Sequence, residues 1–287
     1  MWFKRWLLGR PLATAQASRE RLSNPVALAI FSSDTLSSVA YATEEILLVL
    51  VLAGTVALHY SIGISLVIVV LVAILTASYR QTIYAYPSGG GAFVVAKANL
   101  GEAPGLVAAA ALLIDYVLTV AVSVAAGIAA ITSAVPELHE HRVGLGLLAI
   151  VILTLGNLRG VRESGKIFAL PTYLFVGSLG LVIVAGLGRA LFGAMEEHPL
   201  PSVPAVEGLT LFLLLRAFSS GCTALTGIEA ISNGVPTFRD PTSKNASTTM
   251  TWMACMLGGL FLGITFLAYN YGLVPRAHRG IFAINEL

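Results

Sequence analysis

The sequence predicts an all-α integral membrane protein in which two of the helices are interrupted. Hydrophobic residues make up 56% of the chain and charged residues only 11%, with a mean hydropathy of +0.84. Soluble domains carry about 25% charged residues, so lipid must cover much of this surface. Seven stretches are long and apolar enough to cross a bilayer. Two of them place Ser, Thr, Gly and a carboxylate at mid-membrane depth, where a plain lipid-facing helix carries apolar side chains.

The N-terminal segment, residues 1–24, is basic and aromatic and has no unbroken apolar run of the kind a signal peptide needs. Trp2, Phe3 and Trp6 suit the lipid, and Lys4 and Arg5 suit the headgroups. We interpret these residues as a cytoplasmic amphipathic segment that lies on the membrane surface.

The membrane spans follow from the apolar runs, since a spanning helix needs about 20 mostly apolar residues. The fourth run is short, and we expect it to start earlier or to tilt little. The predicted spans are 25–53, 62–86, 103–134, 144–158, 166–192, 208–234 and 249–274.

The charges in the loops predict the orientation. Most of the 17 Lys and Arg residues fall on the side of the N-terminus, and cytoplasmic loops carry the excess of positive charge. We therefore expect a multi-pass protein of the cell membrane with its N-terminus in the cytoplasm. All 5 histidines then fall in outer loops. Because no histidine lies within the bilayer to activate a nucleophile or a water, we expect no enzyme.

The first and sixth spans contain the interruptions. Residues 30–41 read IFSSDTLSSVAY and residues 217–234 read AFSSGCTALTGIEAISNG. Broken helices at corresponding places in two halves point to a substrate site in inverted-repeat transporters. Close packing of small residues is the alternative, but it explains only the serines and glycines, not Asp34 or Glu229.

Three carboxylates, Asp34, Asp115 and Glu229, lie at mid-membrane depth in the predicted spans, and each costs at least about 2.5–3.5 kcal/mol at a helix centre. Oxygen ligands can replace the hydration shell of a cation, and poor solvation disfavours the charged form of a carboxylate, so one of the three is a candidate proton carrier. In the alternative reading, Asp115 or Glu229 only bonds neighbouring backbone or pairs with Arg216. Helical spacing places each carboxylate in a polar stripe: Asp34 with Tyr41, Asp115 with Thr119 and Ser123, and Glu229 with Thr226.

The loop after the second span, residues 87–93, contains three consecutive glycines. No Gly-Lys-Ser/Thr follows, so the loop is not a phosphate-binding loop. Glycine permits unusual dihedral angles and close backbone approach, and we expect a hinge or a tight packing site here.

These segments resemble the amino acid–polyamine–cation permease superfamily, and within it most closely the KimA branch of the KUP-type potassium–proton symporters. The glycine loop marks only the superfamily, whereas the motifs of the first and sixth spans are specific in combination. The segments that carry the resemblance are 32–47, 79–102, 112–127, 155–164 and 218–241.

The resemblance implies a LeuT-like fold of two inverted five-helix repeats with discontinuous helices 1 and 6. Residues 25–192 would form the first repeat, and residues 193–287 an outer loop and two helices of the second. The resemblance implies potassium among Asp34, Tyr41, Asp115 and Thr226, with Thr119 and Ser123 beside it. Glu229 and Asp34 would serve proton coupling.

The superfamily carries more helices than these seven, so we expect a truncated chain that does not transport alone. The expected partners are membrane lipid, a small inorganic cation and, in the full-length protein, a second copy of the chain. We expect no cofactor and no nucleic acid.

Proton-coupled potassium uptake is thus the leading function. An amino acid permease is the alternative within the same fold, but an aspartate in the break of helix 1 would repel the substrate carboxylate that such a site must hold. A non-transporting receptor or regulatory membrane protein is the alternative from another class.

Overall fold

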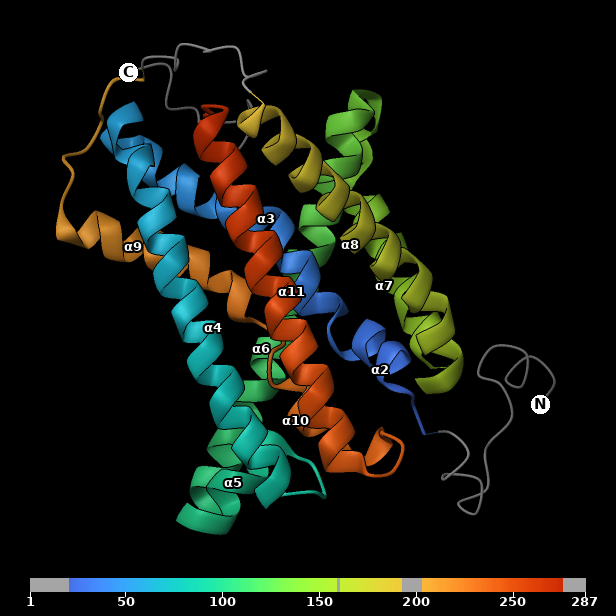
Figure 1. Ribbon diagram of the computed structural model, residues 1–287. Coiled ribbons are helices and arrows are strands. Elements are labelled where there is room, and N and C mark those ends of the chain that lie inside the picture. The colour runs from blue at the N-terminus through green and yellow to red at the C-terminus, as the bar shows by residue number, and fades with distance from the viewer. Residues whose placement is uncertain (1–20, 159–160, 193–202, 276–287) are drawn as a thin grey trace. The chain divides into compact units, whose positions relative to one another are not determined.

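The computed structural model describes residues 21–158, 161–192 and 203–275, and all regular elements in these residues are helices apart from one isolated bridge. Figure 1 shows them along the chain. The elements are α2 (Asn24–Phe31), α3 (Ser33–Leu50), η2 (Val51–Ala53), η3 (Thr55–His59), α4 (Tyr60–Ala85), α5 (Gly91–Leu100), α6 (Glu102–Ala134), η4 (Pro136–His141), α7 (Arg142–Asn157), α8 (Val161–Leu191), α9 (Leu211–Gly221), η5 (Cys222–Leu225), α10 (Ala230–Asn233), η6 (Val235–Thr237) and α11 (Thr242–Asn270).

Seven segments of the described residues are long and apolar enough to cross a membrane, which confirms the predicted number. They are Ser33–Ala53, Thr55–Ala85, Glu102–Ala134, Pro136–Asn157, Ala169–Ala190, Leu211–Asn233 and Thr242–Asn270. The fourth starts earlier than its apolar run, because a 3₁₀ turn precedes α7. The seventh starts at Thr242, before the predicted start at 249, because the first turns of this helix are polar and were not part of the apolar run from which the span was predicted. The segment 1–20 lies outside the described residues.

The described residues divide into two compact units, and each is considered by itself. Unit 1 comprises the described parts of Met1–Ser38, Ala73–Gly177 and Thr226–Met256, and unit 2 those of Val39–Val72, Ser178–Leu225 and Leu257–Leu287.

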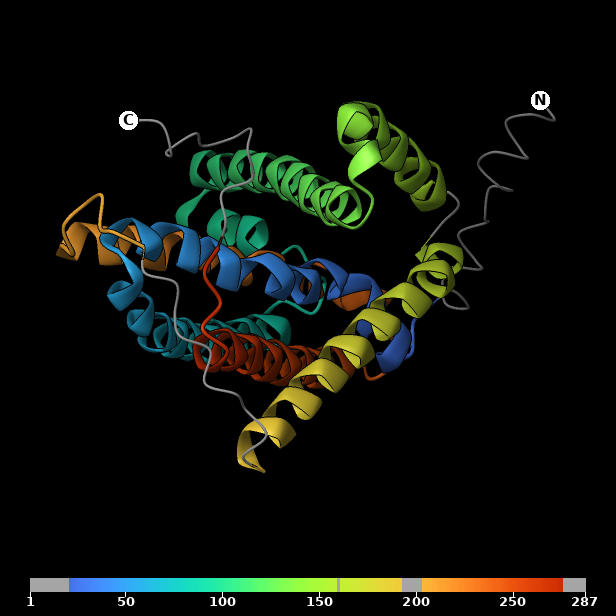
Figure 2. The ribbon, with the colours of Figure 1, turned by 90° about the horizontal axis from the view of Figure 1, so that it is seen from above.

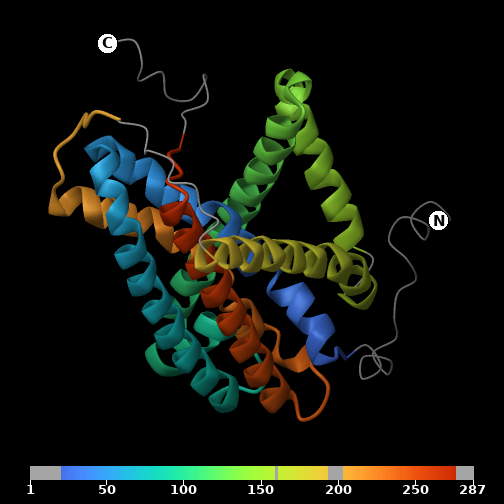
Figure 3. The ribbon, with the colours of Figure 1, turned by 45° about the horizontal axis from the view of Figure 1, so that its top comes forward.

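In unit 1, α6 packs along α5 (Figure 2), and α6, η4 and α7 form a hairpin whose two arms diverge from the η4 connection (Figure 3). The end of α4 lies beside the start of α11, where Arg80 Nε donates to Ser247 Oγ at 3.0 Å and Ser243 Oγ donates to the carbonyl of Ile83 at 3.2 Å. Large apolar side chains on α6 and α7 are exposed. In a membrane-spanning chain, such a surface is available to lipid.

A clip joins the segment before α2 to the loop after α10, also within unit 1. The amide of Leu22 donates to the carbonyl of Thr237 at 2.7 Å, and the amide of Arg239 donates to the carbonyl of Leu22 at 3.1 Å. Arg21 and Asp240 form an ion pair beside these bonds. Since Leu22 is buried as well, the clip combines backbone, apolar and ionic contacts.

Unit 2 has a core of large aliphatic and aromatic side chains that includes Ile46, Ile68 and Phe261. A group of buried hydroxyls lies within this core. Thr265 Oγ1 lies 2.9 Å from Thr43 Oγ1 and 3.2 Å from Ser65 Oγ. Because all three hydroxyls have partners, this polar group is compatible with an apolar interior.

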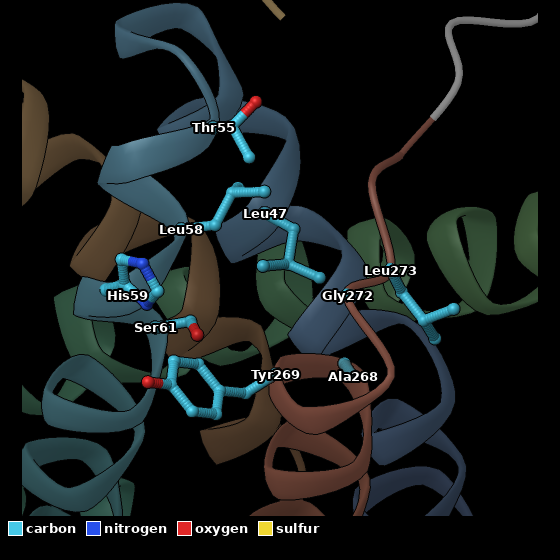
Figure 4. Close-up of a pocket in the computed structure, with 9 residues that line it drawn as sticks. All are labelled: Leu47, Thr55, Leu58, His59, Ser61, Ala268, Tyr269, Gly272 and Leu273. Carbon is cyan, nitrogen blue, oxygen red and sulfur yellow. The ribbon is translucent and has the colours of Figure 1, made fainter. Parts of the chain in front are cut away.

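A small pocket in unit 2 is lined by residues of η3, α4 and α11 (Figure 4). The ring of His59 lies edge-on to the ring of Tyr269, with the centroids 5.3 Å apart. Ser61 also lines the pocket, and its buried hydroxyl has no hydrogen-bond partner among the described residues.

Candidate functional site

The predicted first span, residues 25–53, is interrupted at Ser32, which has φ −110° and ψ 0° and separates α2 from α3. Serine hydroxyls donate hydrogen bonds to neighbouring backbone carbonyls around the break. Ser37 Oγ and Ser38 Oγ donate to the carbonyl of Asp34 at 2.9 and 3.0 Å, as short polar side chains do where they compete with helical bonding. The carboxylate of Asp34 lies in the first turn of α3. A helix N-terminus favours negative charge at this place.

The sixth span is interrupted over a longer stretch. Helix α9 ends at Gly221, a 3₁₀ turn follows, and the single turn of α10 begins only at Ala230. Between them Gly227 has φ +78°, a conformation that glycine adopts at little cost. Helix discontinuity was predicted for both spans from composition, and both helices are broken in the structure.

The two breaks lie against one another within unit 1. A Cβ placed on Gly227 would lie 2.7 Å from Asp34 Oδ2 and 2.8 Å from Thr35 Oγ1. The hydroxyls of Ser38 and Thr226 are 3.3 Å apart. The first and sixth spans therefore meet at Asp34, where the backbone of Gly227 lies against the Asp34 carboxylate. This contact leaves no room for a side chain at position 227.

The polar stripe of α6 turns toward the same place. Asp115, Thr119 and Ser123 are all part-buried on a helix whose other side chains are largely exposed. Ser123 Oγ donates to Asp34 Oδ1 at 3.2 Å. Asp115 is close enough to Asp34 and Glu229 to interact with both electrostatically.

Glu229 is only 8% exposed and occupies the N-cap position of α10. The hydroxyl of Tyr116 interacts with the carboxylate of Glu229, and the Oε1 atom of Glu229 has no hydrogen-bond partner among the described residues. The ion pairs of the described residues are Arg21–Asp240 and Lys97–Glu102. Neither involves Asp34, Asp115 or Glu229, so these three charges are not compensated by a described basic side chain.

Further oxygen atoms around the break have spare acceptor capacity. Ser32 Oγ and Thr35 Oγ1 are buried and, like Glu229 Oε1, without a hydrogen-bond partner in the part of the chain that is described. No group of three or more His, Cys, Asp or Glu side chains in that part is placed to hold one metal ion. A cation at this place would therefore be held by hydroxyl oxygens together with carboxylates, which is the hard-ligand chemistry of ion-selective sites.

Six of the predicted residues fall in unit 1: Asp34, Asp115, Thr119, Ser123, Thr226 and Glu229. Tyr41 lies two turns beyond Asp34 on α3, part-buried, and falls in unit 2. Sequence reasoning did not select Ser38, Tyr116 or Asn233. The spacing of four between Glu229 and Asn233, and of four between Asp34 and Ser38, could have suggested two of them.

Seven spans, two of them broken beside a half-buried and a buried carboxylate, define the class of this protein as a multi-pass helical membrane protein. The family model of the amino acid permeases matches residues 22–276. The chain belongs to this family, which confirms the resemblance found in the motifs.

Two relatives are similar over much of the chain. The potassium transporter KimA of Bacillus subtilis (strain 168) is 50% identical over 275 residues, which are 95% of this chain and 45% of that protein. A monocarboxylic acid transporter of Corynebacterium glutamicum is 24% identical over 210 residues, which are 64% of this chain and 38% of that protein. The chain thus spans less than half the length of the relatives it matches. Both are named as transporters, in agreement with the expectation of a transporter and not an enzyme.

Proposed function

We propose that the full-length protein is a secondary transporter that takes up potassium together with protons. The observation that carries this proposal is the group of Asp34, Asp115 and Glu229, which interact electrostatically with no described basic partner. Uncompensated carboxylates are costly away from water. A bound cation, a proton or both would remove that cost, and a cation–proton symporter binds both on one side of the membrane and releases both on the other.

The roles divide between the carboxylates according to their surroundings. Potassium is held among Asp34, Tyr41, Asp115 and Thr226, with the hydroxyls of Thr119 and Ser123 beside it. Glu229, the most buried of the three carboxylates, serves proton coupling together with Asp34. The fold that suits this division is the LeuT-like inverted repeat, in which broken helices surround a central site and one bundle moves against the other. The excess of Lys and Arg in one set of loops supports a cytoplasmic N-terminus.

The relationship to a potassium transporter supports the choice of substrate, since half of the aligned residues are identical. The name of the family and the second relative keep an amino or carboxylic acid as the other candidate substrate. The contact of Gly227 with the Asp34 carboxylate argues against it, because a substrate carboxylate bound to freed amides at the break would lie next to a negative charge.

Growth of a potassium-uptake-deficient host in limiting potassium tests the proposal. The host carries the full-length protein, Asp34→Asn or Asp115→Asn. Glu102→Gln is the matched control, since its side chain is 85% exposed and pairs only with Lys97 among the described residues. We expect rescue by the wild type and the control and loss in both aspartate variants.

Two results would overturn parts of the proposal. If inserted wild-type protein does not rescue growth, potassium is not the substrate, and uptake of amino and carboxylic acids is measured next. If both aspartate variants rescue as well as wild type, the assignment of the ion site is wrong.

A further inference from the structure

Asn233 closes the single turn of α10 one helical turn beyond Glu229. The backbone amide of Asn233 donates to the backbone carbonyl of Glu229 at 3.0 Å, and the hydroxyl of Ser232 donates to the same carbonyl at 2.8 Å. Residues four apart on a helix lie on the same face. The position of Asn233 is therefore tied to that of Glu229 through the backbone of this turn.

The glycine turn between α4 and α5 presses against Asn233. A Cβ on Gly89 would lie 2.5 Å from the carbonyl oxygen of Asn233, and a Cβ on Gly91 would lie 2.0 Å from its Oδ1 atom. Both glycines have positive φ angles, +76° and +46°. Contacts this short leave no room for a methyl group, so the two glycines pack closely against both the backbone and the side-chain amide of Asn233.

The side-chain amide in turn contacts Tyr116 on α6. Asn233 Nδ2 donates to the Tyr116 hydroxyl at 2.6 Å, while Oδ1 is buried and without a hydrogen-bond partner among the described residues. A tyrosine hydroxyl has one proton to donate. Because Tyr116 accepts from Asn233, its proton is free to be donated to Glu229, the carboxylate with which its hydroxyl interacts. The opposite orientation of the amide would draw that proton to Asn233.

We propose that Asn233 is a positioning residue for proton coupling: held by the glycine turn, it directs the proton of Tyr116 toward the carboxylate of Glu229. This inference rests on the proposed function and adds two residues to it. The groups that face Glu229 are the carboxylates of Asp34 and Asp115 and the hydroxyls of Tyr79 and Tyr116, from α3, α4 and α6. Asn233 thereby links the loop between α4 and α5 to the carboxylate that exchanges the proton.

A double-mutant cycle on the full-length protein tests the link. Potassium uptake into proteoliposomes is measured over a range of pH for wild type, Asn233→Ala, Tyr116→Phe and the double variant. We expect each single variant to lower the maximal rate about tenfold, within the range of coupling between contacting groups. Each should also move the midpoint of the pH profile in the same direction and to the same extent. The double variant should resemble either single variant, because Asn233→Ala removes the donor that orients the Tyr116 hydroxyl and Tyr116→Phe removes the hydroxyl itself.

Asn99→Ala is the matched control. Asn99 Nδ2 donates to the hydroxyl of Tyr86 at 2.7 Å in the same unit, so the variant removes the same kind of bond where no carboxylate of the site takes part. Its profile should match wild type. Thermal stability in detergent is measured for every variant, so that misfolding is separated from altered coupling.

The outcomes separate the inference from the proposed function. Additive effects in the double variant, or an unchanged pH profile in a folded Asn233→Ala protein, would overturn the inference and leave potassium transport intact. A wild-type protein that takes up no potassium would overturn the proposed function, and the inference with it.

Discussion

Ser123 Oγ donates a hydrogen bond to Asp34 Oδ1 at 3.2 Å and so joins α6 to the break of the first span, across 89 positions of sequence. This bond gives the polar stripe of α6 a specific acceptor. The other carboxylate oxygen, Asp34 Oδ2, lies on the side of Gly227 in the break of the sixth span.

Replacing Ser123 by Ala should weaken potassium binding and have little effect on folding. A hydrogen bond to a charged group is worth about 1.5–3 kcal/mol, so we expect the KM for potassium to rise about tenfold or more. Uptake kinetics in proteoliposomes measure the change. Ser133→Ala is the control, since Ser133 is exposed on the same helix. Equal KM values for the two variants would show that the bond does not orient Asp34 for the ion.

Replacing Gly227 by Ala should abolish uptake. The added methyl would lie 2.7 Å from Asp34 Oδ2 at a φ of +78°, a conformation that costs a non-glycine residue about 1–2 kcal/mol before any contact is counted. Gly127→Ala provides the comparison, because a Cβ there meets no atom within 4 Å. That variant should fold and transport normally. Uptake by a well-expressed Gly227→Ala protein would mean that the breaks separate more easily than their contact suggests.

The number and type of the spans could be predicted because hydropathy is a local property of the sequence. The breaks were predictable for the same reason, since the polar residues of IFSSDTLSSVAY and of the sixth span stand out in apolar surroundings. Helix ends were less accurate. Helix α11 begins at Thr242, where polar residues continue the helix beyond its apolar part.

The partners of the polar residues could not be predicted, because they depend on long-range packing. The sequence placed Asp115, Thr119 and Ser123 on one stripe but did not indicate that Ser123 bonds Asp34. The packing of Gly91 on Asn233 joins the start of α5 to the end of the sixth span, and neither residue carries a local signal of the other. Tyr116 follows a selected carboxylate directly, and its role depends on contacts with α10 that only the fold creates.

Two buried serines on α4 should respond oppositely to replacement by Ala. Ser65 Oγ is 3.2 Å from Thr265 Oγ1. Thr265 keeps Thr43 and the carbonyl of Phe261 as partners, so removal of the Ser65 hydroxyl should cost the net value of one hydrogen bond, about 0.5–1.5 kcal/mol. Ser61 Oγ is buried without a described partner, so Ser61→Ala should be neutral or stabilising. Thermal unfolding in detergent compares the two. A marked loss of stability in Ser61→Ala would indicate that the pocket beside His59 holds a water bonded to this hydroxyl.

Replacing Phe238 by Ala should destabilise unit 1 severely. Phe238 is fully buried and stacks on Phe31 with ring centroids 5.7 Å apart, next to the clip that Leu22 forms with the loop after α10. Truncation of a buried Phe to Ala typically costs about 3–5 kcal/mol, so the full-length variant should unfold at a markedly lower temperature. Phe212→Ala is the matched control, since Phe212 is 76% exposed.

The same variant shows whether the clip depends on Phe238. The clip is made by backbone atoms of Leu22, Thr237 and Arg239, so it persists in Phe238→Ala only if these bonds do not need the buried ring for support. Proteolysis of the N-terminal segment, measured alongside unfolding, therefore separates two cases. Faster cleavage at an unchanged melting temperature would mean that Phe238 secures the clip and contributes little to the core.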